Sequence, residues 1–421
     1  MRTLSNTAAI AAIICVLCSI ATPLHGQQPA NSPSPESRVA NAADDFGFRL
    51  LHVLSPETKS GNTIFSPLSL AAVLAMTYKG AAGTTKTAMA KTLGISSLSD
   101  EVLSEGYRRL FATIRNADDA VQLDIANALW VQSGFPIRQR FLDLSRESYG
   151  ANDESVNFAH DPKAAAQTIN AWTDKNTHGK ISRIVGDLDR ATRLVLTDAV
   201  YFKGRWSRPF DRKATETRRF YLRTGDSAMT PMMVQGGEYR YLETAALQAI
   251  SLPYGSGRFE MYIFLPRKSP WASTYQSAMF AFLHSLDSAH WIGWLSRMRR
   301  EDGKIILPKF KLTYGKSLRD TLTSMGMGIA FDPQRADFSG ITSEPVKMWI
   351  SFVEHKTYMK VDEEGTEAAA ATAGGMSAMV VGLPTPKPFE MVVDHPFFCA
   401  IADHDSGYLL FAAIISDPTA D

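Results

Sequence analysis

Hydrophobic residues recur with helical spacing in several stretches of the chain. In the first, residues 39–54, apolar side chains stand three or four positions apart, which predicts a helix. The stretch from Leu68 to Tyr78 is apolar almost all round, as is typical of a helix buried inside a protein. Ser66 is placed to cap it and Pro67 fits its first turn. Helical signals, some broken by turns, also cover 84–94, 103–116, 137–147, 164–177 and 317–325.

Strands are predicted between these helices, where β-branched residues gather or apolar and polar residues alternate. The strongest candidates are 121–131, 193–202, 258–265, 304–312 and 349–361, with three short strands at 391–393, 397–402 and 408–415. Long strands and helices are grouped along the chain and do not alternate regularly. This order predicts an α+β fold with long mixed sheets and helices around them.

The stretch from Val361 to Pro388 fits neither pattern. It carries no charge from Ala368 to Gly382, and most of its side chains are small. As a strand it could therefore bury one face without hiding a charge. It lacks bulky β-branched residues before Val380, and its glycines and prolines favour an exposed loop. A short alanine-rich helix from Glu367 to Ala373 and a flexible linker are the alternatives.

Composition indicates one large domain with a substantial core. The chain has 421 residues, of which 45% are hydrophobic and 21% charged, and no internal linker or repeat divides it. Its formal net charge is +1, so bulk electrostatics gives no reason to expect nucleic acid or an anionic membrane as a partner.

The N-terminus predicts export. Residues 1–26 have a basic start, a short apolar core and a plausible cleavage point, as in a secretory signal peptide. Residues 27–38 are rich in Pro, Ser, Gln and Asn and are expected to be a disordered lead-in to a single domain at 39–421. The mature protein is then secreted, extracellular or periplasmic. Cys399 would be its one cysteine, a buried small hydrophobe, and the lack of disulfides favours bacterial export.

Enzyme motifs are missing from the sequence. It has no Gly-x-Ser-x-Gly elbow, no His-Glu-x-x-His and no phosphate-binding Gly-x-x-x-x-Gly-Lys loop. The nine histidines show no ligand spacing with cysteines or acids, and Arg297–Arg300 is too short for a dense basic site. We therefore expect no catalytic residues, no cofactor and no metal.

Seven sequence strings, together with the segment Glu363–Thr372, occur in the order typical of one known family. The strings are Asn62–Ser69, Ile125–Val131, Asn170–Ile181, Ala199–Trp206, Leu307–Phe310, Ala336–Ile341 and His395–Phe397. On these residues, from about 40 to 419, the chain resembles an inhibitory serpin. The resemblance implies a serpin fold of three β-sheets, eight or nine surrounding helices and an exposed reactive loop at about 363–388.

The resemblance also implies a mechanism. A serpin is metastable, and once a protease cuts its loop, the loop inserts as a new strand of the central sheet. The hinge that starts this strand would comprise Glu363, Gly365, Thr366, Glu367, Ala368, Ala369, Ala370, Ala371 and Thr372. Its small residues favour a suicide inhibitor over the alternative, a non-inhibitory serpin that acts as a carrier or chaperone.

The reactive bond follows from the family's register. Counted from Gly365, it falls between Met379 and Val380, although the stretch from there to Pro396 is several residues longer than usual, and the neighbours Ala378 and Val380 are the alternative sites. Met379 between small and branched residues suits a serine protease with an apolar primary pocket, elastase-, chymotrypsin- or subtilisin-like. A cysteine protease is the other candidate partner. We expect the inhibitor to be a monomer.

Two further clusters are implied by the family. The shutter, where the central sheet must part, corresponds to Ser66, Ser69, Asp198 and His355, with Asp198 in place of the family's usual Asn. An Asp198–His355 ion pair would make unfolding depend on pH, and Asp198→Asn would flatten that dependence. The alternative is a hydrogen-bonded carboxylate with no special role. The breach at the top of the sheet corresponds to Trp206, Lys309 and Glu363, with a Lys309–Glu363 salt bridge.

Overall fold

The computed structural model describes residues 33–55, 61–115, 117–270, 272–342, 346–366 and 387–420. Residues 34–421 belong to one compact unit. Its α-helices are α1 Pro35–Leu54, α2 Pro67–Lys79, α3 Gly83–Leu93, α4 Asp100–Arg115, α5 Gln139–Tyr149, α6 Pro162–Asn176, α7 Tyr275–Ser285, α8 Ser288–Arg297 and α9 Arg319–Leu322. No helix within the described ranges is long and apolar enough to cross a membrane.

A six-stranded sheet forms the centre of the molecule. In order across the sheet, its strands are β10 Phe310–Ser317, β11 Ile350–Asp362, β12 Gly365–Thr366, β4 Leu194–Arg205, β2 Val121–Gln132 and β3 Asn152–Val156. The short strand β12 lies between one end of β11 and the end of β4. Beyond it, β11 and β4 pair directly and in parallel, from Ile350 with Leu194 to Tyr358 with Tyr201.

The second sheet has nine strands. In order, eight of them are β1 Thr63–Phe65, β15 Leu409–Ile415, β14 Phe397–Asp403, β8 Phe259–Pro266, β7 Leu247–Pro253, β6 Ser227–Glu243, β9 Arg299–Pro308 and β13 Phe389–Val392; β5 Glu216–Tyr221 pairs with β6. The 17-residue strand β6 pairs with β5 at one end and β7 at the other. Hydrogen bonding therefore joins two of the three expected sheets into one.

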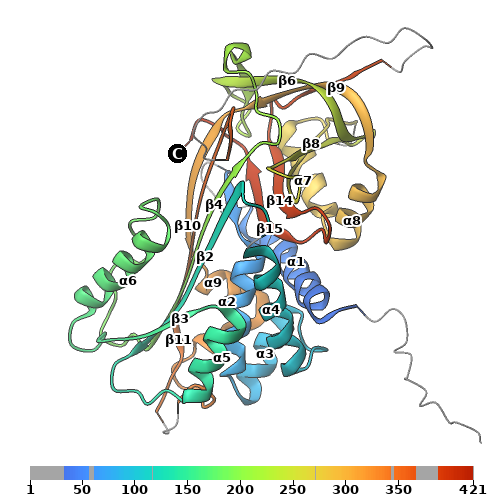
Figure 1. The fold of residues 1–421 in the computed structure, drawn as a ribbon. Coiled ribbons are helices and arrows are strands. Elements are labelled where there is room, and N and C mark those ends of the chain that lie inside the picture. The colour runs from blue at the N-terminus through green and yellow to red at the C-terminus, as the bar shows by residue number, and fades with distance from the viewer. Residues whose placement is uncertain are drawn as a thin grey trace, which may run out of the picture. The chain divides into compact units, whose positions relative to one another are not determined.

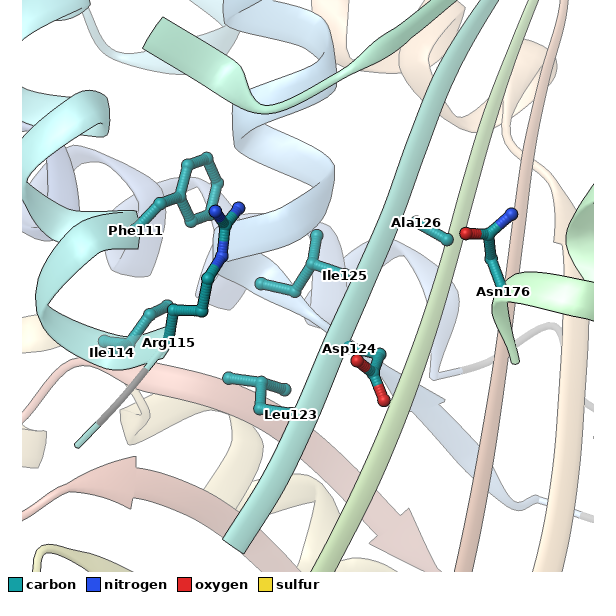
Figure 2. A pocket seen from close by; sticks show the side chains of 8 residues that line it. All are labelled: Phe111, Ile114, Arg115, Leu123, Asp124, Ile125, Ala126 and Asn176. Carbon is teal, nitrogen blue, oxygen red and sulfur yellow. The ribbon is translucent and has the colours of Figure 1, made fainter. Parts of the chain in front are cut away.

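Two hydrophobic clusters cover the two faces of the six-stranded sheet. Helix α6 lies on one face, apart from the other helices (Figure 1), and packs there over Trp130 and its neighbours. The other face carries the main core, which joins α1–α5 to both sheets. Neighbouring residues of β2 alternate between these faces: Leu123 and Ile125 point toward α4, and Ala126 joins the α6 cluster (Figure 2).

Helix α2 is buried along almost its whole length, as its apolar sequence predicts. Every residue from Pro67 to Tyr78 is buried. The Ser66 hydroxyl accepts from Ser69 N at 3.3 Å and Pro67 stands at the first helical position, so the capping prediction is confirmed. The helix begins next to the six-stranded sheet, where Ser69 contacts Asp198, and ends at the partly exposed Lys79.

Three sequence-based boundaries need correction. Helix α1 begins at Pro35, inside the expected disordered lead-in, because Ser34 caps it by accepting from Ser37 N. The expected strand 304–312 is two strands in different sheets, β9 and β10, separated at Lys309. The expected helix 317–325 is only four residues of α-helix followed by an irregular turn, in which Gly326 has φ +106°. The predicted signal peptide, 1–26, lies outside the described residues.

Candidate functional site

Two residues of the predicted hinge, Gly365 and Thr366, form the short strand β12 in the central sheet. Gly365 pairs with Asp362 of β11 and Arg205 of β4, and Thr366 pairs with Val361 and Gly204. Gly365 has φ +152°, and a Cβ there would collide with the carbonyl oxygen of Gly204. Glycine is therefore required at this turn. The two residues of β12 lie where an inserted strand would start.

Thr366 is fixed inside the protein. Its side chain is fully buried, and its hydroxyl lies 2.6 Å from the Tyr254 hydroxyl. The Tyr254 ring stacks on Trp206, with 4.4 Å between ring centroids. Burial raises the pKa of Tyr254 well above its usual range, so the phenol stays protonated and can donate to Thr366. Tyr254 was not singled out from the sequence.

The turn that leads into the hinge is held by the breach residues. Trp206 Nε1 donates to Asp362 O at 2.9 Å. Lys309 Nζ lies 2.8 Å from Glu363 Oε2, so the expected salt bridge is present, and the Thr215 hydroxyl donates to Glu363 Oε1 at 2.8 Å. Burial alone would raise the pKa of Glu363, but these two donors outweigh it, and the pKa lies below its usual range.

Glu364 takes part in the same turn. Its carboxylate forms an ion pair with Arg212, and its carbonyl oxygen accepts from Trp206 N at 2.9 Å. Arg212 and Thr215 come from the short segment before β5, to which no sequence motif had assigned a role. The turn is therefore bonded to the segment Arg212–Thr215 and to Lys309, which lies between β9 and β10. These contacts must break or rearrange if the hinge moves.

The shutter residues meet as a buried polar cluster at the middle of the sheet. Asp198 and His355 face each other on the paired strands β4 and β11, with 2.9 Å between Asp198 Oδ2 and His355 Nδ1. The Ser69 hydroxyl, from the first turn of α2, donates to Asp198 Oδ1. Asn127 of β2 adds a partner that sequence reasoning missed: its Oδ1 lies 3.2 Å from Ser69 Oγ. A signal was available, because Asn127 lies within the Ile125–Val131 string.

The geometry sets the proton positions in this cluster. A carboxylate can only accept, so His355 Nδ1 carries a proton toward Asp198. His355 Nε2 is buried without a hydrogen-bond partner in the described part of the chain, and the ring packs edge-on to Phe65. The Asp198–His355 contact predicted from the sequence is thus present, while its effect on the pH dependence of unfolding stays a prediction.

The rest of the predicted site lies outside the described residues. This holds for the hinge residues Glu367, Ala368–Ala371 and Thr372 and for the reactive bond Met379–Val380. Cys399 lies in β14, and burial raises the pKa of its thiol to about 12. Within the described residues no group of three or more His, Cys, Asp or Glu side chains could hold a metal ion.

Two small pockets lie near these residues. One, of about 200 Å³, lies where α4, β2 and the end of α6 meet, and Figure 2 shows the residues that line it. Another, of about 330 Å³, adjoins the breach between Arg205, Trp206 and Glu364. Neither has the nucleophile, base and oxyanion donors of an active site.

Comparison with known proteins identifies the family. The model of the family described as Serpin (serine protease inhibitor) matches residues 41–418. The chain is a serpin. Its relatives include an uncharacterized serpin-like protein of Thermococcus kodakarensis, 36% identical over 91% of this chain and 86% of that protein. The leukocyte elastase inhibitor of Xenopus laevis is 33% identical over 90% of this serpin and 99% of the relative.

Solved structures confirm the fold. The native state of tengpin, a thermophilic serpin, matches with a TM-score of 0.81 and 26% identity, covering 92% of this chain and 96% of tengpin. Human thyroxine-binding globulin, crystallised with its hormone, matches with a TM-score of 0.82 and 26% identity, covering 92% of this chain and all of that one. The α+β serpin fold predicted from the sequence is therefore confirmed, and the family as a whole is one of protease inhibitors with some non-inhibitory members.

Proposed function

We propose that this serpin is a secreted, monomeric suicide inhibitor of a serine protease. The observation that carries the proposal is the position of Gly365 and Thr366. They form the first pairs of an inserted strand while β11 and β4 remain joined beyond them. In this mechanism the protease serine attacks the carbonyl of Met379, the Met379–Val380 bond breaks, and the acyl-enzyme is carried away as the loop inserts.

The length of the sheet agrees with that bond. In the antiparallel register that starts at Thr366, each step back along β11 or β4 advances the loop by one residue. Counted along β4, Met376 then lies opposite Leu194, the first residue of that strand. Counted along β11, Ser377 lies opposite Ile350; the two counts differ by one residue because the register of β11 shifts between Ile350 and Phe352. The sheet can therefore take up the loop as far as Ser377, two residues before Met379. This supports the count from the hinge over the count from the C-terminus.

Side-chain size supports insertion. The eight β11–β4 pairs from Ile350 to Tyr358 must separate to admit the strand, and a new ladder on both sides replaces them. A gain on the order of ten hydrogen bonds, at ~1 kcal/mol net each, would drive the change. Thr366 already faces the core, so Ala368, Ala370 and Thr372 would follow it to the same face. A charge at any of these positions would cost several kcal/mol when buried.

The target class rests on Met379 and on the relatives. An apolar side chain at the reactive bond suits proteases with an apolar primary pocket, elastase-, chymotrypsin- or subtilisin-like. One relative, from Xenopus laevis, is named a leukocyte elastase inhibitor. A cysteine protease with a similar preference is the second candidate. Export is proposed because residues 1–26 resemble a signal peptide, which would direct the inhibitor out of the cell or into the periplasm.

A panel of purified proteases tests the proposal. Each is mixed with the purified protein and run on a denaturing gel, where a trapped acyl-enzyme appears as a band at the sum of the two masses. We expect such a band with an elastase-, chymotrypsin- or subtilisin-like enzyme and none with trypsin. Mass spectrometry of the released C-terminal fragment should give Val380 as its first residue. Cleavage without any covalent band across the panel would contradict the inhibitor.

A carrier or chaperone is the second candidate function. The likeness to thyroxine-binding globulin, a hormone-binding protein, favours it. The buried Thr366–Tyr254 contact also fits a carrier, because it fixes the hinge at the start of the sheet without any cleavage. A carrier needs no complete insertion, so it would be cut by the same proteases without trapping them and without becoming more stable.

A further inference from the structure

A cavity of about 610 Å³ lies at the edge of the helical layer, away from the hinge, shutter and breach. Its walls come from the end of α2, the starts of α3, α4 and α5, and the Ser339–Gly340 loop. Figure 1 shows α2–α5 gathered together on one side of the six-stranded sheet. A volume of this size falls within the range of small-molecule sites in proteins.

The charged groups in the lining are predominantly positive. They are Lys79, Lys86, Arg138, Arg140 and one carboxylate, Asp100. Four cations against one anion leave an excess of three positive charges. Asp337, the acid closest in sequence to the lining residues Ser339 and Gly340, does not line the cavity. Its carboxylate accepts from Ser339 N at 3.0 Å.

Asp100 is shared between two lysines. Lys79 Nζ and Lys86 Nζ each lie 3.2 Å from Asp100 Oδ2. The Lys79 side chain is only 10% exposed, and burial lowers its pKa although Asp100 partly compensates. Glu101 adds a smaller favourable charge interaction with Lys79, but Asp100 is the one carboxylate in direct contact with the two ammonium groups, and it lies between them in a partly dehydrated place. Positive charge in such a place is stabilised by a further anion.

The arginines leave donors free for that anion. Arg138 uses Nε to donate to Ser339 O at 3.1 Å, and its two terminal nitrogens have no partner in the described residues. Arg140 makes no hydrogen bond or ion pair there. Helix α5 also begins at this wall with no side-chain cap and no acid in its first turn, so its positive end is uncompensated. A guanidinium and a helix N-terminus both suit phosphate oxygens.

We propose that this cavity binds a small soluble anion that carries two phosphate groups. The shape distinguishes it from an ordinary solvated basic surface, because the cations stand on separate elements around a shared hollow and do not follow one exposed helix. An anion with three or four charges would balance the excess, and Arg138 and Arg140 can each hold phosphate oxygens in a forked contact. The proposal is independent of protease inhibition.

Calorimetric titration of the full chain with inorganic pyrophosphate, at near-physiological salt, tests the site. Saturable one-to-one binding is expected, with orthophosphate at least about tenfold weaker because it offers fewer charged oxygens. Arg140→Gln should weaken pyrophosphate roughly tenfold, and Lys86→Gln combined with Arg140→Gln should weaken it further. The control Arg297→Gln, the same change at an exposed position on α8, should bind as the unaltered protein does.

Three results would overturn the site: no saturable binding of pyrophosphate, binding unchanged in Arg140→Gln, or an equal loss in Arg297→Gln. Far-ultraviolet circular dichroism and melting of each variant ensure that a loss of binding is not a loss of folding. Sedimentation with phosphatidylcholine vesicles that contain phosphatidic acid distinguishes a lipid phosphate. We expect no sedimentation; sedimentation that Arg140→Gln abolishes would contradict the assignment to a soluble anion.

Discussion

Asp198 connects three elements of the shutter through one carboxylate. Each of its oxygens accepts from a different donor, Ser69 of α2 and His355 of β11, and all three side chains are fully buried or nearly so. Removal of the carboxylate would leave two buried donors without acceptors, which costs more than a lost surface contact. Strands β4 and β11, which would have to part in the proposed insertion, are joined here by a polar contact as well as by packing.

Substitutions of Asp198 should therefore differ sharply in cost. Asp198→Ala should lower the free energy of unfolding by about 3 kcal/mol or more, because both donors lose their partner. Asp198→Asn should cost only about 1 kcal/mol, since the amide oxygen can accept from His355 and Ser69 can turn to Asn127 Oδ1. Urea unfolding of both variants measures the difference. Equal losses would contradict the arrangement.

Asp153 is a second buried carboxyl, in β3 against α5. Neither of its oxygens has a hydrogen-bond partner in the described structure, and the nearby Ser145 hydroxyl donates to Phe141 O. Burial raises the pKa of Asp153 to about 7, against smaller lowering effects of Arg146 and Ser145. In the unfolded chain the same group titrates near pH 4. The folded protein therefore holds a proton that the unfolded chain releases between these two values.

The contribution of Asp153 to the stability should fall as pH rises from about 4 to about 7, because its carboxyl ionises there in the unfolded state but not in the folded one. Asp153→Asn removes this term and should raise the free energy of unfolding by ~2 kcal/mol near pH 8. Near pH 4 it should have little effect. Asp143→Asn, an exposed acid on α5, is the control for the charge change. A variant that stabilises the protein equally at both pH values would contradict the titration.

At the scale of elements, the proposed mechanism makes the hinge decide the outcome of cleavage. Strand β12 is two residues long, and the Thr366 side chain points into the core. In a longer strand, successive side chains would point alternately toward the core and away from it. Further insertion repeats this geometry residue by residue along β11 and β4. A charged side chain on the core-facing side would stop the strand at its first step.

Thr366→Arg should convert the inhibitor into a substrate. The arginine would have to enter the buried place beside Tyr254, so insertion would be too slow to trap the acyl-enzyme before water releases it. Glu367→Arg is the matched control: the next residue of an inserted strand would face the opposite side, so this variant should retain most of the trapping. The fraction of protease held in a gel-stable complex measures both. Undiminished complex formation by Thr366→Arg would rule out insertion from this hinge.

The sequence predicted elements better than the contacts between them. The buried helix α2 and the strands β4 and β11 were foreseen from periodicity and capping, although the pairing of the two strands was not. The Lys309–Glu363 contact was foreseen from the family resemblance. Tyr254 and Arg212 were not. Their roles depend on which distant segments lie next to the hinge turn, and neither residue stands in a pattern that distinguishes it from other tyrosines and arginines.

The start of α1 was missed for a different reason. Ser34 and Pro35 are cap and first-turn residues, but the surrounding Pro- and Ser-rich composition favoured disorder. The junction at Lys309 was missed because the residues on both sides have the same strand-like pattern. Only the pairing shows that β9 and β10 belong to different sheets.

At the scale of the whole molecule, the proposed mechanism requires the six-stranded sheet to accept one more strand. In the described structure Gly365 and Thr366 are paired with β11, β11 and β4 are paired beyond them, and the Asp198–His355 contact is intact. The new strand would replace one parallel pairing with two antiparallel ones, and antiparallel pairing is slightly more stable per residue. The uncut protein should thus be the less stable of the two forms.

Thermal unfolding before and after a single cut in the loop tests this account most directly. A protease that does not form a complex is used to cut between residues 367 and 386, and both forms are heated under the same conditions. Insertion should raise the melting temperature by at least about 10 °C, as expected for roughly ten added hydrogen bonds in a protein of this size. A cut protein that melts at the same temperature as the intact one would contradict loop insertion.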